Sequence, residues 1–380
     1  MAILAVALRV CASLRALFSL PSRVCIFESV GLLENIPLAP LTTIKIGGPA
    51  RYFLDAHNAS EVQEAVIFAR SRDLPLFVLG GGSNLVIADA GWPGLALKIA
   101  IQGIEQGAGQ DEEGKVRFDV GAGESWDKFV SHAVRARCSG IECLSGIPGS
   151  VGGTPVQNVG AYGQEVSETI ASVQVLDLKD GQVRDLSPEA CAFAYRTSIF
   201  NTSERGRFIV LRVTYALTPE GQPRLAYADL KRHFEGRETA PNLAETREAV
   251  RHIRARKGML ITPGDPDSQS AGSFFKNPVL SEKEHEELKR RAAARGLTVP
   301  SYPALESHQK VSAAWLVERS GFARGFGFGR VGISSRHALA IVNRGGATAV
   351  DVLTLKEQIQ HRVAEIWGVA LEPEPVMVGF

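Results

Sequence analysis

The apolar residues in the first third of the chain follow two different periodicities. Four short apolar runs predict strands, because each is brief and bounded by polar or turn-forming residues. These runs cover residues 51–56, 75–79, 94–100 and 116–123. After the first run, four apolar residues fall on one face of a predicted helix: Val62, Ala65, Val66 and Ala69. Ser60, with Gln63 three residues later, predicts a capping box at the start of this helix.

A second helix is predicted from about residue 125 to residue 138. The region that follows it has mainly strand-like patterns. The runs 173–178 and 183–186 flank Lys179-Asp180-Gly181, which predicts a β-hairpin. A long run rich in β-branched residues at 207–217 predicts a further strand. Antiparallel pairing of this kind indicates an α+β fold and not a uniformly parallel, doubly wound sheet.

The last part of the chain combines predicted helices with short strands. A stretch containing proline at 236–242 is typical of a linker. Beyond it, helical spacing covers about 243–258, 281–295, 311–320 and 350–367. Short strands are expected around 273–275, 337–343 and 375–378.

Composition excludes several classes of protein. The chain has 380 residues, 45% of them hydrophobic and 22% charged, as in a globular protein of two or three domains. A net charge of +1 gives no global field for nucleic acid or a membrane, so neither is expected as a partner. The five cysteines are odd in number and show no metal-ligand spacing. We therefore expect no metal, and reduced structural thiols in a cytoplasmic protein.

The first 25 residues are apolar but lack the order of a signal peptide. Arg9 and Arg15 interrupt the apolar stretch, whereas a signal peptide places its basic residues before an unbroken apolar core. No run of about 18 uncharged apolar residues occurs, so no spanning helix is expected. We expect residues 1–37 to form an N-terminal extension that is either disordered or not part of the native protein.

Two glycine-rich segments are candidates for an anion cradle. The first, Gly80-Gly81-Gly82-Ser83-Asn84, directly follows an apolar run. The second extends from Gly146 to Gly153 and is followed by Asn158 and Gly160. Glycines let backbone N–H groups approach a phosphate closely, and two loops suit the two charges of a dinucleotide pyrophosphate. The alternative is that both segments are tight turns.

Standard nucleotide motifs do not explain these loops. The GxxxxGK[ST] pattern of a P-loop is absent from the sequence. One GxGxxG match occurs at Gly327, Gly329 and Gly332, but it lacks a preceding strand. We expect a simple turn at that position.

Three further segments contain side chains that could act on a ligand. Arg196 suits a carboxylate or phosphate, because its donors form a fixed fork. Ser273 lies among small and aromatic residues and could donate a proton. Glu374 lies between two prolines, which would orient its carboxylate. The alternatives are a surface arginine, a turn and a solvated cap, so these residues alone indicate an enzyme or a binder of a dinucleotide and a second anion.

Taken in chain order, these segments resemble the UDP-N-acetylenolpyruvoylglucosamine reductase family over about residues 38–380. The matching motifs are Thr43–Arg51, Leu79–Leu85, Gly146–Gly153, Asn158 with Gly160–Gly163, Tyr195-Arg196, Ala271–Pro278, Ser312–Leu316 and Leu371–Glu374. The resemblance implies an FAD-binding domain of the vanillyl-alcohol-oxidase type at 38–235, in two subdomains at about 38–105 and 106–235. It also implies a substrate-binding domain at 236–380, so the expected fold class is α+β.

The resemblance further implies the cofactor and the reaction. FAD would bind non-covalently and be reduced by NADPH. Hydride would then pass to the terminal vinyl carbon of UDP-N-acetylenolpyruvoylglucosamine, and protonation of the neighbouring carbon would give UDP-N-acetylmuramate, a peptidoglycan precursor. The residues expected at the FAD site are Gly80, Gly81, Gly82, Ser83, Asn84, Gly146, Pro148, Gly149, Ser150, Gly152, Gly153 and Gly160.

The same resemblance assigns roles to individual side chains. Arg196 and Glu374 would stabilise the enol(ate), and Ser273 would donate the proton; Glu372 is a rival for Glu374. The residues expected to bind substrate are Tyr227, Lys257, Asn277 and His337. The chain departs from the family pattern at Leu41, where Asn is usual, and at Pro375, where a small apolar residue is usual.

Two other functions remain open at this point. One is a different flavoenzyme of the same fold, an oxidase of alcohols or sugars with its flavin tethered through His or Cys. The other is a nucleotide-binding protein without catalytic activity. For the reductase, the chain is expected to be a cytoplasmic monomer.

Overall fold

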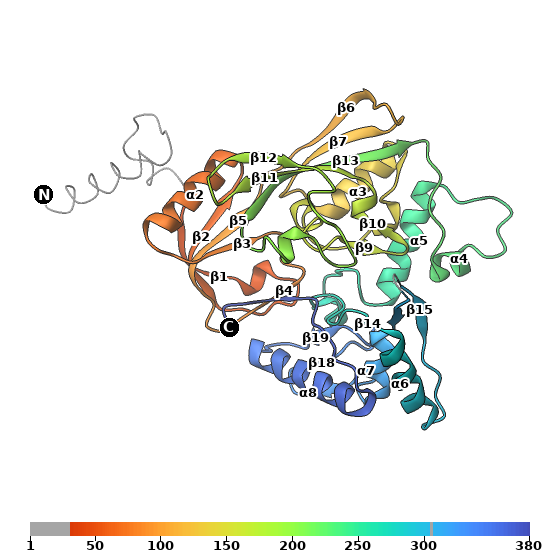
Figure 1. The fold of residues 1–380 in the computed structure, drawn as a ribbon. Coiled ribbons are helices and arrows are strands. Elements are labelled where there is room, and N and C mark those ends of the chain that lie inside the picture. The colour runs from red at the N-terminus through yellow and green to blue at the C-terminus, as the bar shows by residue number, and fades with distance from the viewer. Residues whose placement is uncertain (1–30, 305–306) are drawn as a thin grey trace, which may run out of the picture.

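The computed structural model describes residues 31–304 and 307–380. Figure 1 shows a larger part, formed by the red-to-green half of the chain, above a smaller part formed by the blue segments. The larger part contains two sheets with their covering helices. The smaller part contains helices and short strands.

The first sheet has the strand order β1-β2-β5-β3. Its strands are β1 (Leu33–Pro37), β2 (Pro49–Ala56), β3 (Leu76–Leu79) and β5 (Trp92–Ile99). Strands β2, β5 and β3 pair in parallel, while β1 pairs antiparallel with β2. The sheet thus begins inside the range 1–37 that was expected to be an extension, and residues 1–30 lie outside the described part.

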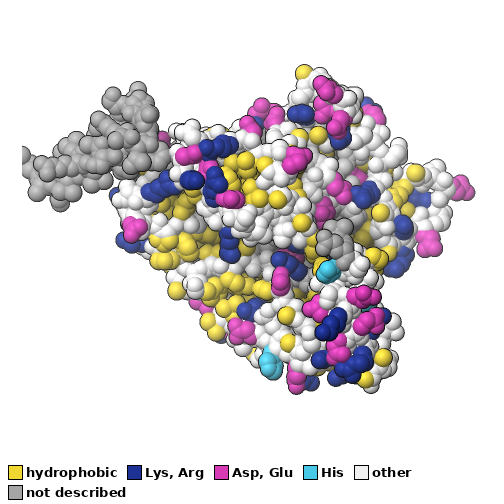
Figure 2. All heavy atoms as spheres, in the orientation of Figure 1, with side chains coloured by type: hydrophobic (Ala, Val, Ile, Leu, Met, Phe, Trp, Pro, Cys, Tyr) yellow, Lys and Arg dark blue, Asp and Glu magenta, His cyan; other side chains and the backbone are white. Residues whose placement is uncertain are grey.

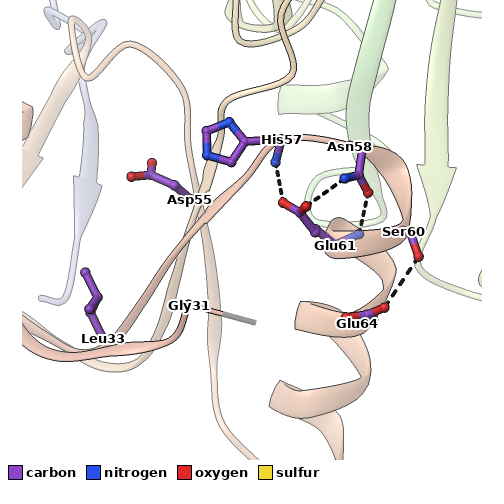
Figure 3. A pocket seen from close by; sticks show the side chains of 8 residues that line it. All are labelled: Gly31, Leu33, Asp55, His57, Asn58, Ser60, Glu61 and Glu64. Carbon is purple, nitrogen blue, oxygen red and sulfur yellow. Dashed lines mark hydrogen bonds between the residues drawn. The ribbon is translucent and has the colours of Figure 1, made fainter. Parts of the chain in front are cut away.

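Helix α2 (Ala59–Ser71) buries the predicted apolar face. Its start differs from the prediction, because Asn58 is the N-cap and accepts a hydrogen bond from the Glu61 N–H at 3.0 Å. Ser60 lies inside the helix and contacts Glu64 instead. The capping box predicted at Ser60 and Gln63 is therefore wrong, since the preceding amide side chain already satisfies the free N–H. Figure 3 shows these contacts beside a surface hollow that contains none of the predicted site residues.

The second sheet is antiparallel, with the strand order β12-β11-β13-β7-β6. Its strands are β6 (Ile104–Gln110), β7 (Val116–Gly121), β11 (Ile170–Asp177), β12 (Val183–Leu186) and β13 (Phe208–Pro219), and β8 (Cys138–Ser139) pairs with the end of β13. The pairing of β11 with β12 confirms the predicted hairpin. Helix α3 (Trp126–Arg135) packs against the sheet through Phe129, whose ring lies 4.9 Å from that of Tyr215 on β13.

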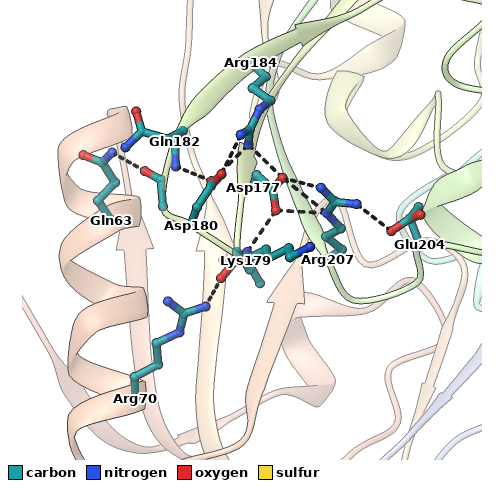
Figure 4. A network of polar contacts seen from close by, with 11 residues as sticks. Gln63, Arg70, Asp177, Lys179, Asp180, Gln182, Arg184, Glu204 and Arg207 are labelled. Atoms are coloured by element: carbon teal, nitrogen blue, oxygen red, sulfur yellow. Dashed lines mark hydrogen bonds and ion pairs between the residues drawn. The ribbon is translucent and has the colours of Figure 1, made fainter. Parts of the chain in front are cut away.

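A charged network joins the two sheets at the β11–β12 hairpin (Figure 4). The fully buried carboxylate of Asp177 accepts hydrogen bonds from Arg207 at 2.7 Å and from Arg184 at 2.8 Å. The hydrogen bond from Arg207 lowers the pKa of Asp177 below its usual value. Two side chains of α2, Gln63 and Arg70, donate to carbonyl oxygens of the same hairpin. The two halves of the larger part are thereby held together.

The helices predicted for the last part of the chain are largely confirmed as α5 (Leu243–Arg256), α6 (Glu282–Ala293), α7 (Ala313–Arg319) and α8 (Ala349–Trp367), preceded by the unpredicted α4 (Ala228–His233). Helices α4 and α5 pack against the larger part, where Leu230 and Val250 form a cluster with Cys143, while α6, α7 and α8 belong to the smaller part. The short strands are β14 (Val279–Leu280), β15 (Ser301–Pro303), β16 (Gln309–Val311), β17 (Gly327–Phe328), β18 (Val331–Ile333) and β19 (Ile341–Asn343). The GxGxxG match forms the β17–β18 hairpin, so it is a turn, as predicted. The strand expected at 273–275 is reduced to a single bridge between Phe275 and Pro373.

The chain returns to the larger part through β20 (Val376–Val378). This strand pairs in parallel with β4 (Leu85–Ile87), which directly follows the first glycine segment. Figure 1 shows the blue β20 segment running beside β4. The pairing brings the residues just before β20 close to that glycine segment.

The surface carries charges of both signs. Figure 2 shows basic and acidic side chains interspersed over the visible face. Across the described ranges, no helix is long and apolar enough to cross a membrane. Cys138, Cys143 and Cys191 are free and buried, while Cys11 and Cys25 lie outside the described residues.

Candidate active site

The two predicted glycine loops lie face to face. A Cβ atom on Gly81 would lie 2.4 Å from Gly149 Cα and 2.6 Å from Ser150 N. Gly149 has a φ of +126°, and a Cβ atom there would lie 2.9 Å from Ser83 Oγ. Only glycine permits two backbones to approach this closely. The fold therefore joins the loops into one cradle, although 60 or so residues separate them in the chain.

The cradle has unpaired backbone donors. No residue that the structure describes accepts a hydrogen bond from the N–H groups of Gly81, Gly82, Ser83, Gly149 or Ser150. Gly82 and Ser150 are buried, and a buried N–H group almost always has a partner. Convergent unpaired N–H groups of this kind bind anions. The residues present thus fit the pyrophosphate of a dinucleotide cofactor.

Arg196 and Glu374 form a buried ion pair beside this cradle. Arg196 Nε lies 3.2 Å from Glu374 Oε1, and the two side chains are only 19% and 15% exposed. Arg196 Nη2 donates to the carbonyl oxygen of Gly160 at 2.7 Å, which fixes the guanidinium plane. The buried Nε–H makes no hydrogen bond within the described chain despite its closeness to Glu374. This donor therefore faces the Glu374 carboxylate without a well-formed hydrogen bond.

Glu374 is favoured over its rival Glu372 by burial. Burial raises the pKa of Glu374, and the charges of Arg196 and Lys276 lower it only in part. Its carboxyl group therefore takes up a proton at a higher pH than an ordinary glutamic acid. Glu372 is 75% exposed and lies 3.4 Å from Lys276 Nζ at the surface.

Ser273 reaches the same place through backbone pairing. Its neighbour Phe274 accepts a hydrogen bond from the Glu374 N–H at 2.9 Å, and Phe275 bridges Pro373. The segments that carry Ser273 and Glu374 therefore lie side by side. All three predicted catalytic side chains, including Arg196, are brought to one region.

Asn84 links the first glycine loop to this region. Its Nδ2 donates to the Glu374 carbonyl oxygen at 3.1 Å and to Gln157 Oε1 at 2.7 Å. Its own carbonyl oxygen accepts from the Val376 N–H at 2.9 Å. The side-chain amide is thus engaged within the protein, where it holds the peptide of Glu374.

Asn277 lies just beyond the Ser273 segment. Its Oδ1 accepts from the Ala313 N–H at the start of α7 at 2.9 Å. Burial raises the pKa of the Tyr195 hydroxyl. Lys310 Nζ lies 4.1 Å from the centroid of the Tyr195 ring. The Tyr195 ring therefore lies against Lys310, next to Arg196 in the chain.

Tyr227 and Lys257 belong to a second group, between the start of α4 and the end of α5. Tyr227 is 42% exposed, and its ring stands edge-on to that of Tyr162 at 5.3 Å. Lys257 Nζ lies 5.9 Å and 6.0 Å from the two ring centroids and 2.5 Å from Asp229 Oδ2. Burial lowers the pKa of Lys257, but the hydrogen bond with Asp229 and the nearby tyrosines raise it more.

His337 faces the same group. Burial, followed by the positive charges of Lys257, Arg254 and Arg324, lowers its pKa to about 4. Its Nδ1 accepts a hydrogen bond from the Leu339 N–H at 3.0 Å. The imidazole is thus neutral at pH 7, and its proton lies on Nε2, where it can be donated to a ligand.

Arg254 is a site residue that was not predicted from the sequence. It is 7% exposed, its Nε donates to the Gly146 carbonyl oxygen at 3.1 Å, and burial lowers its pKa. Its charge also acts on Tyr162 and His337, so it connects the second glycine loop with the Lys257 group. Arg254 follows Val250 by about one helical turn on the apolar face of α5, so the sequence placed a charged residue among buried positions. A buried charge needs a partner, and this was the signal that could have identified Arg254.

Comparisons with known proteins support this reading of both halves. Residues 50–187 match the model of an FAD-binding domain, and residues 265–378 match the C-terminal domain of UDP-N-acetylenolpyruvoylglucosamine reductase. Together with the paired glycine loops, these matches define the class of protein. It is a flavoprotein with an α+β fold, in which an FAD-binding domain precedes the C-terminal domain of the reductase, as predicted.

Whole-chain relatives give the family. The chain is 45% identical to the UDP-N-acetylenolpyruvoylglucosamine reductase of Thermobifida fusca, over 91% of this chain and 98% of the relative. It is also 45% identical to that of Streptomyces coelicolor, over 95% and 93% of the two chains. The crystal structure of the Thermus caldophilus reductase superimposes with a TM-score of 0.61 at 28% identity, over 92% and 98% of the two chains. The chain belongs to the UDP-N-acetylenolpyruvoylglucosamine reductase family.

Proposed function

We propose that the chain catalyses the NADPH-dependent, FAD-mediated reduction of UDP-N-acetylenolpyruvoylglucosamine to UDP-N-acetylmuramate. The observation that carries this proposal is the buried Arg196–Glu374 pair, which lies beside the Ser273 segment. Hydrogen bonds connect the pair to the first glycine loop through Asn84 and to Gly160 behind the second loop. The family membership supports the proposal, since the relatives carry the name of this activity.

The side chains divide the chemistry among them. FAD, when bound in the glycine cradle and reduced by NADPH, supplies the hydride for the vinyl carbon. Addition of hydride there leaves an electron pair on the neighbouring carbon, as an enolate conjugated with the substrate carboxylate. Arg196, which is held in place by the Gly160 carbonyl oxygen, would place its positive charge beside the developing negative charge, and a preorganised charge stabilises it far better in a dry site than water does.

Proton delivery completes the reaction. Glu374, whose pKa is raised by burial, can donate a hydrogen bond to the enolate oxygen in its protonated form. Ser273 gives its hydroxyl proton to the carbon that holds the electron pair, and solvent restores that proton. The product leaves with one hydride and one proton added across the double bond.

The second group would hold the nucleotide part of the substrate. We assign Lys257 and the neutral His337 to the diphosphate. We assign Tyr227 to a contact with the part of the ligand that lies between these two residues. Asn277 would contact the uridine end in addition to its hydrogen bond with the Ala313 N–H. A cytoplasmic location belongs to the same proposal, because the substrate is a cytosolic nucleotide sugar. We propose a cytoplasmic location together with a monomeric state. Sedimentation of the purified protein would measure the latter.

An absorbance scan of the purified protein tests the proposed function. We expect a flavin spectrum that anaerobic NADPH bleaches and that UDP-N-acetylenolpyruvoylglucosamine restores, with one UDP-N-acetylmuramate formed per flavin reoxidised. UDP-N-acetylglucosamine is the matched control, since it lacks the enolpyruvyl group and should leave the flavin reduced. A yellow colour that stays with the denatured protein would point instead to a tethered oxidase. Absence of bleaching by NADPH would point to a binding protein.

A further inference from the structure

Asp229 is a carboxylate placed inside a group of cations. Its Oδ2 lies 2.5 Å from Lys257 Nζ, and its Oδ1 lies 3.6 Å from Arg232 Nη1. The charges of Lys257, Arg254 and Arg324 all act on His337, which shows how closely positive groups gather here. Asp229 is the carboxylate that the described chain places against Lys257.

The surroundings leave Lys257 few other partners. The rings of Tyr162 and Tyr227 stand edge to face and flank the ammonium group at about equal distances. The ammonium therefore lies between two aromatic rings and one carboxylate. An anion that approaches Lys257 meets Asp229 already bound to it.

This ion pair contributes little to folding. The Lys257 and Asp229 side chains are 37% and 25% exposed, and pairs with this much solvent contact stabilise proteins only weakly. The pair does, however, neutralise the lysine that the proposed function assigns to a diphosphate. A like charge beside a bound anion weakens its binding and is a means of setting affinity.

We infer that Asp229 competes with a bound diphosphate for Lys257. Asp229 forms the ion pair with the lysine in the free protein, and binding of a diphosphate displaces it. The inference rests on the proposed function, which supplies the diphosphate. Tight binding of a ground state does not accelerate the chemical step. A built-in counter-ion therefore lowers the affinity for substrate and product alike. The product is then released more readily, which favours turnover.

Titration calorimetry with uridine diphosphate on the FAD-loaded protein tests this inference. Asp229→Asn should lower the dissociation constant at least about 5-fold at low ionic strength, the lower end of typical coupling between sites. The gain should shrink as salt is added, because it is electrostatic. Glu235→Gln is the matched control, since it changes the net charge equally on an exposed residue after α4 and should shift the constant less than about twofold.

A double-mutant cycle separates competition from a general field effect. In a Lys257→Gln background, Asp229→Asn should give a clearly smaller gain, because the contested lysine is gone. Asp229→Ser provides a second variant if the amide disturbs α4, and thermal unfolding checks that each variant is folded. Unchanged or weaker binding in both folded Asp229 variants, with normal binding by the wild type, would overturn the inference and leave the proposed function standing. Failure of the wild-type protein to bind uridine diphosphate would overturn both.

Discussion

Ser273 can be tested separately from flavin reduction, because its proposed proton is needed only after hydride has left the flavin. Ser273→Ala should still be bleached by NADPH at a near-normal rate. Reoxidation by the enolpyruvyl substrate should slow by at least ~10²-fold, the lower end of what a positioned acid contributes. Stopped-flow absorbance measures both steps, and Ser273→Cys should recover part of the second. Slow reduction with normal reoxidation would instead place this serine at the nicotinamide.

The two glutamates near β20 make a matched pair for substitution. Glu374→Gln should slow reoxidation by ~10²-fold or more, the cost of losing one strong donor to an oxyanion, because an amide N–H stabilises the enolate oxygen much less than a carboxylic acid O–H does. Glu372→Gln removes an exposed partner of Lys276 and should change the same rate less than about threefold. Rapid-reaction measurements at several pH values would compare them. Equal effects of the two substitutions would refute the assignment of Glu374.

His337 should make stability sensitive to acid. Its pKa is about 4 in the folded protein and about 6.5 when unfolded, so the unfolded state binds the extra proton as pH falls between these values. Stability is therefore lost from about pH 6.5 downwards, by up to about 2 kcal/mol at pH 5. His337→Gln should lose less stability than the wild type between pH 7 and pH 5 in urea titrations. Parallel losses in the two proteins would show that the histidine titrates normally.

At the scale of loops and strands, the close contact between the two glycine loops is expected to determine whether FAD can bind. Gly81→Val would force a Cβ atom to within about 2.4 Å of Gly149 Cα, so the loops would separate and the unpaired N–H groups would diverge. We expect loss of most bound FAD, measured as flavin absorbance per protein after gel filtration. Gly109→Val on β6 is the control, since a Cβ atom there meets nothing within 4 Å. Full flavin occupancy in the Gly81 variant would contradict the cradle.

The helices and long strands could be predicted because their signals are local. The apolar stripe of α2 and the turn residues of the β11–β12 hairpin specify those elements within a few positions. The N-cap was misplaced because Asn58 and Ser60 are both good caps, and only the hydrogen bond to Glu61 distinguishes them. Strand β6 was missed because its residues are mostly exposed, so it has no apolar period.

At the scale of the whole molecule, the residues of the site could be predicted from the sequence, but the long-range contacts that bring them together could not. The resemblance named Arg196, Ser273 and Glu374, yet their proximity depends on segments more than 70 residues apart in the chain. Arg254 was not among the residues that the resemblance named, and its position in the buried stripe of α5 does not reveal that it contacts the carbonyl oxygen of the distant Gly146. Long-range backbone contacts leave little trace in residue type, because any residue offers the same carbonyl group.

The parallel pairing of β4 with β20 constrains when the protein can mature on the ribosome. Strand β20 is synthesised about 290 residues after β4, which at typical elongation rates is a delay of roughly 15 to 60 s. Until then β4 keeps an unpaired strand edge, and such edges invite contacts with other nascent chains. Glu374 arrives only just before β20, so the polypeptide can fold its first sheet early but can complete the active site only after β20 has been synthesised.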